Sequence, residues 1–275
     1  MSSLPNVLSI AGSDPSGGAG IQADLKTFAA LGCYGMAVIT ALTAQNTQGV
    51  SGVHIPPAEF VAQQIDAIFA DIEVSAVKIG MLGSPDVVEA VAQALKRHGA
   101  KNIVLDPVLV ATSGDSLGAP GVVEAMRAHL LPLARVVTPN IPEAMRFTGL
   151  AEPQNVQDLA VLAGHFLALG AQAVLVKGGH MQGDKASDVL FEADQAEVFS
   201  QPRVDTKNTH GTGCTLSSAI AAQLAKGLDL PRAVESAKAY LTQALRDSAR
   251  LDVGHGHGPV HHLWTLTEMK SGPRS

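Results

Sequence analysis

The residues best suited to chemistry lie in one stretch of the 275-residue chain, between Asp205 and Gly227. Just before Cys214 this stretch contains four small residues that favour turns: Thr209, Gly211, Thr212 and Gly213. Leu216, Ile220 and Leu224 then recur every four residues, which predicts a helix buried on one face. The first N–H groups of such a helix lack partners and lie at the positive end of its dipole. The stretch therefore predicts an anion site with Cys214 at its mouth.

Charged side chains follow three other apolar segments. Asp106 ends the segment 102–105, Glu143 comes shortly after the segment 135–138, and Lys177 ends the segment 173–176. Ligands of open parallel sheets bind where strands end, and carboxylates there supply the oxygen ligands that Mg²⁺ takes. Two glycines after Lys177 would let a phosphate chain approach its ammonium. Two alternatives stay open, because such acids also cap the next element and a lysine there can extend to solvent.

These groups together match the needs of phosphoryl transfer. That reaction requires positioning, a cation and a metal against the phosphate oxygens, amides for the transferred group, and a group near the attacking hydroxyl. The sequence therefore predicts a kinase that uses ATP and Mg²⁺. The positive end of the helix dipole should lower the pKa of Cys214 and favour its thiolate, whereas the negative charge of ATP phosphates would oppose a thiolate. The sequence does not show which effect is larger.

The segments alternate between strand and helix patterns, which predicts a mostly parallel sheet with helices on both faces. Strands are expected near 7–11, 34–42, 50–55, 76–79, 102–108, 135–138 and 173–177, with a hairpin across 187–199. Helices are expected after Gly20, after Pro57 with Phe60 facing inward, and at 84–98, 142 onward, 156–169, 212–227 and 232–250. We expect one domain over residues 1–275.

Two polar residues in this pattern have competing interpretations. Asp24 is expected in the first turn of the first helix, either as an acid favoured by the helix dipole or as a carboxylate directed at a ligand. Gln45 lies in a polar cluster expected just past a strand end, where it could contact a nitrogen heterocycle or be a solvated turn residue. The glycines between Gly12 and Gly20 match neither a dinucleotide fingerprint nor a P-loop, so we reject those motifs.

Composition narrows the class of protein. The chain is 46% hydrophobic, and 19 basic against 25 acidic residues give a net charge of −6, which argues against a nucleic-acid partner. No apolar run reaches the roughly 18 residues that a membrane span needs, and the N-terminus does not resemble a signal peptide. Two cysteines are too few for a disulfide framework, so we expect a cytoplasmic protein with free thiols and with Cys33 in the core.

The motif Gly211-Thr212-Gly213-Cys214 resembles the anion hole of the ribokinase-like kinases, with Cys where most of them have Asp. The loop 11–20 and the tail Gly254-x-Gly-x-Gly-Pro-x-x-His262 extend the resemblance over nearly the whole chain, to the hydroxymethylpyrimidine/phosphomethylpyrimidine kinases of thiamine biosynthesis. The resemblance implies a ribokinase-like fold and a homodimer. It also implies ATP-dependent phosphorylation of 4-amino-5-hydroxymethyl-2-methylpyrimidine and then of its monophosphate.

The resemblance also implies roles for individual residues. Cys214, Lys177, Gly211 and Gly213 match catalytic positions, and Asp106 and Glu143 match the acids linked to Mg²⁺. The pyrimidine would be held by Ala19, Asp24, Gln45, Met81 and Val108. The nucleotide would be held by Asn140, Lys177, Thr209, Gly211, Thr212, Gly213 and Lys238.

Two other functions compete with this one. A pyridoxine/pyridoxal kinase shares the fold, but the branch with a similar cysteine has a second Cys where this chain has Ala111-Thr112-Ser113. A nucleotide-binding regulatory module without catalysis is the other rival, and Lys177, Asp106 and Cys214 argue against it. The histidines of the tail could suggest a metal site, but we favour a structural tail because zinc sites need defined ligand geometry.

Overall fold

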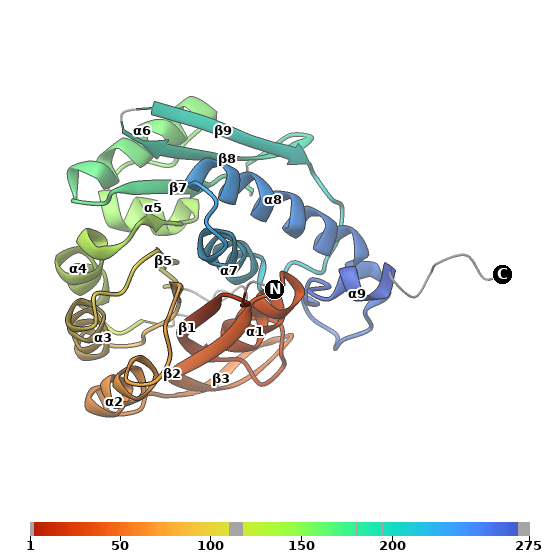
Figure 1. The fold of residues 1–275 in the computed structure, drawn as a ribbon. Helices are drawn as coiled ribbons and strands as arrows, with labels where there is room; N and C mark the ends of the chain where they lie inside the picture. Colours follow the sequence, from red (N-terminus) through yellow and green to blue (C-terminus); the bar gives the residue numbers. More distant parts are fainter. Residues whose placement is uncertain (1–2, 110–117, 180, 194, 269–275) are drawn as a thin grey trace.

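The computed structural model describes residues 3–109, 118–179, 181–193 and 195–268. Its centre is a 9-stranded sheet in the order β3-β2-β1-β4-β5-β6-β7-β8-β9 (Figure 1). The strands are β1 (Asn6–Ser13), β2 (Tyr34–Asn46), β3 (Gly49–His54), β4 (Ala76–Ile79), β5 (Ile103–Leu105), β6 (Val136–Val137), β7 (Ala173–Lys177), β8 (Lys185–Glu192) and β9 (Gln195–Pro202). Neighbours from β2 to β7 pair in parallel, while β3, β8 and β9 pair antiparallel at the two ends. The mostly parallel sheet is confirmed.

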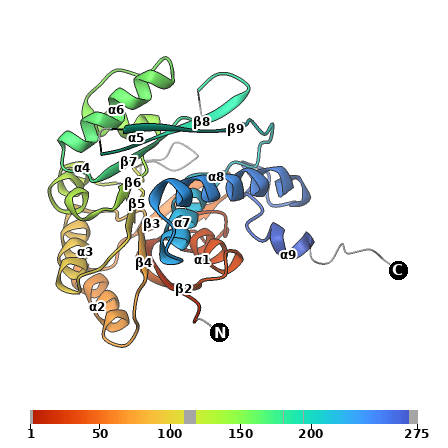
Figure 2. The ribbon, with the colours of Figure 1, turned by 45° about the horizontal axis from the view of Figure 1, so that its top comes forward.

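Helices cover both faces of the sheet, as Figure 2 shows. They are α1 (Gly20–Ala30), α2 (Ala58–Phe69), α3 (Pro85–Arg97), α4 (Val122–Ala125), α5 (Ile141–Thr148), α6 (Val156–Ala168), α7 (Thr212–Ala225), α8 (Leu230–Arg246) and α9 (Trp264–Glu268). One core contains residues of α2 to α6, and the other contains residues of α1, α7 and α8. Each face of the sheet thus buries its own apolar layer. In the part of the chain that the structure describes, no helix has the length and apolar character needed to cross a membrane.

Local signals set several helix boundaries as expected. Ser84 caps α3 by accepting a hydrogen bond from the N–H of Val87, and Pro85 occupies the first turn. Asn140 and Glu143 form a capping box at the start of α5. Cys33 is buried, as expected.

Some boundaries differ from the prediction. Strand β2 continues to Asn46, so Gln45 lies within a strand and not past its end, because β3 pairs with it through Asn46 and Gly49. Phe60 is 53% exposed, since α2 packs on the sheet through Val61 and Ile65. The long C-terminal helix starts earlier and ends at Arg246, and α9 was not predicted. The loop expected at 113–118 lies almost wholly outside the described residues.

Candidate active site

The predicted anion loop forms the N-terminus of α7. Gly211 is its cap, and a positive φ of 79° places it in the left-handed region that favours glycine. A Cβ built on Gly211 would lie 1.9 Å from the carbonyl oxygen of Gly18, so no larger residue fits. Thr209 closes the preceding turn by accepting a hydrogen bond from the N–H of Thr212. The first N–H groups of α7 are therefore placed for an anion.

Lys177 and Asp106 lie at this helix start. A Cβ built on Gly213 would lie 3.2 Å from the Lys177 Nζ and 3.7 Å from the Asp106 Oδ2. The Lys177 ammonium donates to the Asp106 Oδ1 at 2.7 Å, although β6 separates their strands. Burial alone would raise the pKa of Asp106, but the positive charges of Lys177 and Lys78 hold it below its usual value. Burial alone would lower the pKa of Lys177, but Asp106 and Glu143 raise it. Both side chains are therefore charged at neutral pH.

Asn140 and Glu143 lie beside this pair. Asn140 forms an isolated parallel bridge with Lys177, and the Lys177 N–H donates to the Pro139 carbonyl at 2.8 Å. The Glu143 side chain is buried, and its Oε2 accepts from the Asn140 N–H at 2.8 Å. Burial raises the pKa of Glu143 to about 7; Lys177 opposes that rise, and Asp106 adds to it. A bound cation would favour the ionised form of Glu143.

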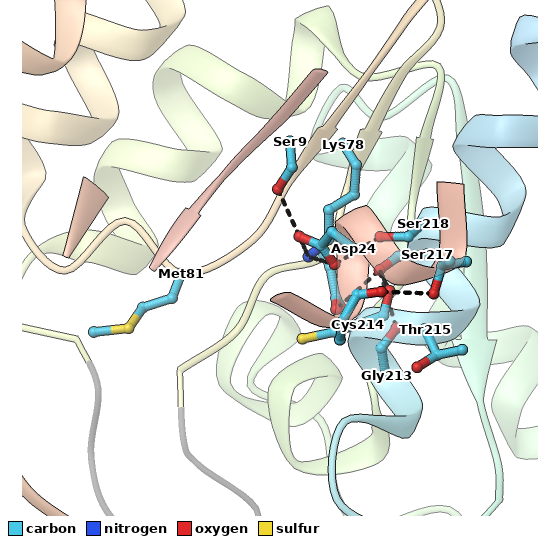
Figure 3. Close-up of polar contacts among 12 residues, drawn as sticks. Ser9, Asp24, Lys78, Met81, Gly213, Cys214, Thr215, Ser217 and Ser218 are labelled. Atoms are coloured by element: carbon cyan, nitrogen blue, oxygen red, sulfur yellow. Dashed lines mark hydrogen bonds and ion pairs between the residues drawn. The ribbon is translucent and has the colours of Figure 1, made fainter. Parts of the chain in front are cut away.

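A second buried ion pair lies beneath the same helix turn. Both Asp24 oxygens are 2.9 Å from the Lys78 Nζ, and neither side chain has exposed surface. Ser9 and Ser218 also donate to the Asp24 carboxylate, at 2.6 and 2.7 Å. Figure 3 shows this network. The four contacts fill the acceptor sites of the carboxylate.

One expectation for Asp24 is therefore corrected. It is not in the first turn, because α1 begins at Gly20. Its carboxylate is enclosed by Lys78 and two serines, and contact with a pyrimidine stays a prediction.

Sequence reasoning missed Lys78, which lies in the apolar strand β4. Burial alone would lower its pKa, but Asp24, Cys214 and Asp106 raise it, so its ammonium is a fixed positive charge. The available signal was the lysine itself, since a strand buried on both faces rarely contains a charge without a partner. The partner, however, is 54 residues away in the chain.

Cys214 is half-buried, and in Figure 3 its sulfur points away from the Asp24 network. Burial raises its pKa to about 11, and Asp24 and Asp106 contribute to the rise while Lys78 opposes it. In the protein without ligands, Cys214 is therefore a neutral thiol. This answers the question of its protonation state that the sequence left open.

Comparisons with known proteins agree with this geometry. The model of the family described as phosphomethylpyrimidine kinase matches residues 14–261. The chain belongs to this family. It is 55% identical over 256 residues to a hydroxymethylpyrimidine/phosphomethylpyrimidine kinase of Rhizobium meliloti, covering 93% of this chain and 96% of that protein. It is 51% identical to the enzyme of that name from Salmonella typhimurium over 258 residues, which are 94% of this chain and 97% of the relative.

Solved structures show the same fold. A Bacillus subtilis pyridoxal kinase in complex with ADP superposes with a TM-score of 0.87 at 39% identity, covering 96% of this chain and all of that one. A Clostridium difficile phosphomethylpyrimidine kinase superposes with a TM-score of 0.78 at 45% identity, covering 88% and 99%. The ribokinase-like fold expected from the sequence is confirmed.

The other residues that the family resemblance assigns to the pyrimidine lie at the ends of neighbouring strands. Ala19 follows β1, Gln45 lies near the end of β2, Met81 follows β4 and Val108 follows β5. These four strands are adjacent in the order β2-β1-β4-β5. Their carboxyl ends meet at one edge of the sheet, where ligands of such folds bind. Contact with a pyrimidine stays a prediction for each of them.

Lys238 is the expected nucleotide residue on α8. Its ammonium is buried and donates to the Asp188 Oδ2 at 2.6 Å, while the Asp188 Oδ1 accepts from the Gly178 N–H at 3.0 Å. Lys238 therefore supports the glycine pair that follows Lys177. Nucleotide contact by Lys238 stays a prediction.

The glycine loop after β1 packs on the anion loop. The Asp14 carboxylate accepts from the N–H groups of Gly18 and Ala19 at 3.1 and 2.8 Å, and its Oδ2 lies 2.8 Å from the His210 Nε2. A Cβ built on Gly18 would lie 2.3 Å from the His210 ring, so this glycine permits close packing. Sequence reasoning missed this Asp14–His210 contact, which joins residues 196 positions apart.

A single and a double variant test the buried ion pair. Lys78→Met should lower the free energy of unfolding by about 3–5 kcal/mol, because it leaves the Asp24 charge buried without its partner. Lys78→Met combined with Asp24→Leu should recover most of that loss. Urea unfolding followed by circular dichroism measures both values.

The exposed pair between Arg97 and Asp66 gives the matched control, since their side chains are 52% and 44% exposed. Arg97→Met should lower the free energy of unfolding by less than about 1 kcal/mol. Equal losses for Lys78→Met and Arg97→Met would contradict the role assigned to Lys78.

Alkylation of Cys214 tests its neutral thiol. Only the thiolate reacts, so in a Cys33→Ala background the iodoacetamide rate should rise about tenfold per pH unit from pH 7 to 9. It should show no plateau there, because the Cys214 pKa is raised to about 11. Mass spectrometry gives the rate. A plateau below pH 8 would show that the start of α7 lowers the pKa of Cys214 more than burial raises it.

Proposed function

We propose that this chain transfers the γ-phosphoryl group of ATP to the hydroxyl of 4-amino-5-hydroxymethyl-2-methylpyrimidine. A second transfer, to the monophosphate, then gives the diphosphate. The observation that supports this most directly is the meeting of Lys177 and Asp106 at the glycine-capped start of α7. The names of the similar proteins, including the two kinases of Rhizobium meliloti and Salmonella typhimurium, support the choice of substrate.

Each part of the site has a role in this reaction. The N–H groups of residues 211–214 stabilise charge on the transferred group, and Lys177 exchanges part of its contact with Asp106 for a phosphate oxygen. Asn140, Thr209 and Thr212 border the nucleotide phosphates, and Lys238 supports that side through Asp188.

Asp106 and Glu143 fit a Mg²⁺ ion. Their two carboxylates interact electrostatically beside Lys177, and Mg²⁺ in kinases binds through one or two carboxylates together with phosphates and waters. The ion would supply positive charge against the negative charge of the phosphates. Among the described residues, no group of three or more His, Cys, Asp or Glu could hold a metal.

A neutral Cys214 suits both transfers. In the first it orients the substrate hydroxyl, and a loose transition state needs no strong base. In the second the acceptor is a phosphate oxygen, and a thiolate would repel that anion. A thiol whose pKa is raised to about 11 avoids this repulsion at neutral pH.

Pyridoxal kinase is the second candidate, because a pyridoxal kinase of the same fold is 39% identical to the chain.

A homodimer in the cytoplasm completes the proposal. Strand β3 lies at an edge of the sheet, and such edges are commonly covered, here by a second copy. Analytical ultracentrifugation would distinguish a dimer from a monomer.

Product analysis tests the function. Purified protein with ATP and Mg²⁺ is given the pyrimidine alcohol or pyridoxal, and chromatography with mass spectrometry identifies the products. We expect the pyrimidine monophosphate and then the diphosphate, with little product from the Cys214→Ala variant although it still binds ATP. Phosphorylation of pyridoxal alone would favour the second candidate. ATP binding with neither product would favour a regulatory module.

Gln45→Ala tests the assignment of the pyrimidine edge. The variant should raise KM for the pyrimidine by about tenfold, the usual loss for a hydrogen bond of about 1.4 kcal/mol, and leave KM for ATP within about twofold. Gln48→Ala, at an exposed position of the same hairpin, is the matched control and should change neither value. Equal effects of Gln45→Ala on both substrates would refute the assignment.

A further inference from the structure

The C-terminal tail, residues 254–262, crosses from the hairpin formed by β2 and β3 to the anion loop. We call this segment the strap. Figure 1 shows the chain after α8 passing beside the N-terminal strands. In the sequence Gly254-His255-Gly256-His257-Gly258, the two histidines are exposed and Gly258 is buried. Residues 255–257 form bends and Gly254 is exposed, so the chain turns here, with Gly256 half-buried and Gly258 buried against the protein.

The strap first contacts Thr47, at the tip of the hairpin. The N–H of His257 donates to the Thr47 carbonyl at 3.0 Å, and the N–H of Gly256 donates to the Thr47 Oγ1 at 3.1 Å. A Cβ on Gly256 would lie 1.9 Å from the Thr47 carbonyl oxygen, and one on Gly254 would lie 2.3 Å from the Thr47 Oγ1. Only glycine permits this approach.

The second contact is with Asn208 and His210, which precede the cap of α7. The His210 N–H donates to the Gly258 carbonyl at 3.0 Å, and His210 forms a parallel bridge with Pro259. A Cβ on Gly258 would lie 2.1 Å from the Asn208 Oδ1. His210 directly precedes Gly211, so this contact reaches the cap of α7.

The strap ends at His262, which is buried against α7 and α8. Its Nε2 lies 3.0 Å from the Thr215 Oγ1, and its carbonyl accepts from the Tyr240 hydroxyl at 2.6 Å. Burial lowers the pKa of His262 to about 3, so the ring is neutral at physiological pH. This end of the strap is therefore fixed to the body of the protein.

We propose that Gly254, Gly256 and Gly258 are positioning residues that hold the hairpin carrying Gln45 at a set distance from the anion loop. Thr47 is two residues from Gln45, and Gly258 contacts the segment leading to Gly211. The strap would thus set the alignment of the acceptor ring with the phosphoryl group, and a misplacement of about 1 Å costs about 10²-fold in rate. This inference rests on the proposed function.

Alanine substitutions at the two ends should produce different kinetic changes. Gly256→Ala displaces Thr47, so KM for the pyrimidine should rise by about tenfold or more while KM for ATP changes by less than about twofold. Gly258→Ala displaces Asn208, so kcat should fall by about tenfold or more with KM for the pyrimidine retained. Adding Asn208→Ala to Gly258→Ala removes the clashing side-chain atoms and should restore most of kcat.

Matched controls come from the same segment. His255→Ala and His257→Ala, at exposed positions, should leave all kinetic values within about twofold, since they remove no contact with the protein body. If Gly256→Ala does not fold, Thr47→Val removes only the hydrogen bond from Gly256 and should raise KM for the pyrimidine by a smaller factor. Parallel changes in every kinetic value for both glycine variants, without rescue by Asn208→Ala, would overturn the proposal.

A readout without turnover separates this inference from the proposed function. Hydrogen–deuterium exchange should show faster exchange of the amides at 43–50 in Gly256→Ala and unchanged exchange in His257→Ala. If the wild-type protein phosphorylates no substrate, the proposed function fails, and faster exchange would still support the strap contact. Unchanged exchange in Gly256→Ala would overturn the strap contact itself.

Discussion

The ion pair between Lys177 and Asp106 is the interaction on which the site depends. It joins the ends of β7 and β5 across β6 and holds both charges within reach of the first turn of α7. Neither charge could remain buried alone, because removing an ion from water without a partner costs several kcal/mol. The pair therefore keeps an amine and a carboxylate ready for a nucleotide and its metal.

Lys78 and Asp24 form a second buried ion pair. Together the two pairs contribute two positive and two negative charges to this part of the core. Cys214 is exposed to the fields of both pairs, and the carboxylates oppose its ionisation while Lys78 favours it. Because burial adds to the carboxylate effect, the thiol stays neutral. The protonation state of Cys214 is thus decided by its burial and by the charges of Lys78, Asp24 and Asp106.

Glycines determine how closely the loops around these charges can approach one another. Gly18 and Gly211 let the loop after β1 lie against the anion loop, and Gly256 lets the strap lie against the hairpin tip. At each point a single methyl group would meet a backbone or ring atom at less than 2.5 Å. The close approach explains why these segments are rich in glycine although none of them is a nucleotide fingerprint.

The sequence by itself determined the features whose causes lie within a few residues. The start of α7 at the glycine motif, a helix starting near Pro142, and the charged ends of β5 and β7 were all predicted, because helix starts and periodicity are local. The family also followed from motifs present in the chain. Only the tertiary structure decided the partner of Lys78, the enclosure of Asp24, the contact between Asp14 and His210, and the path of the strap. Those contacts join residues between 15 and 209 positions apart, and which of them meet depends on the order of strands in the sheet, a property that no local pattern encodes.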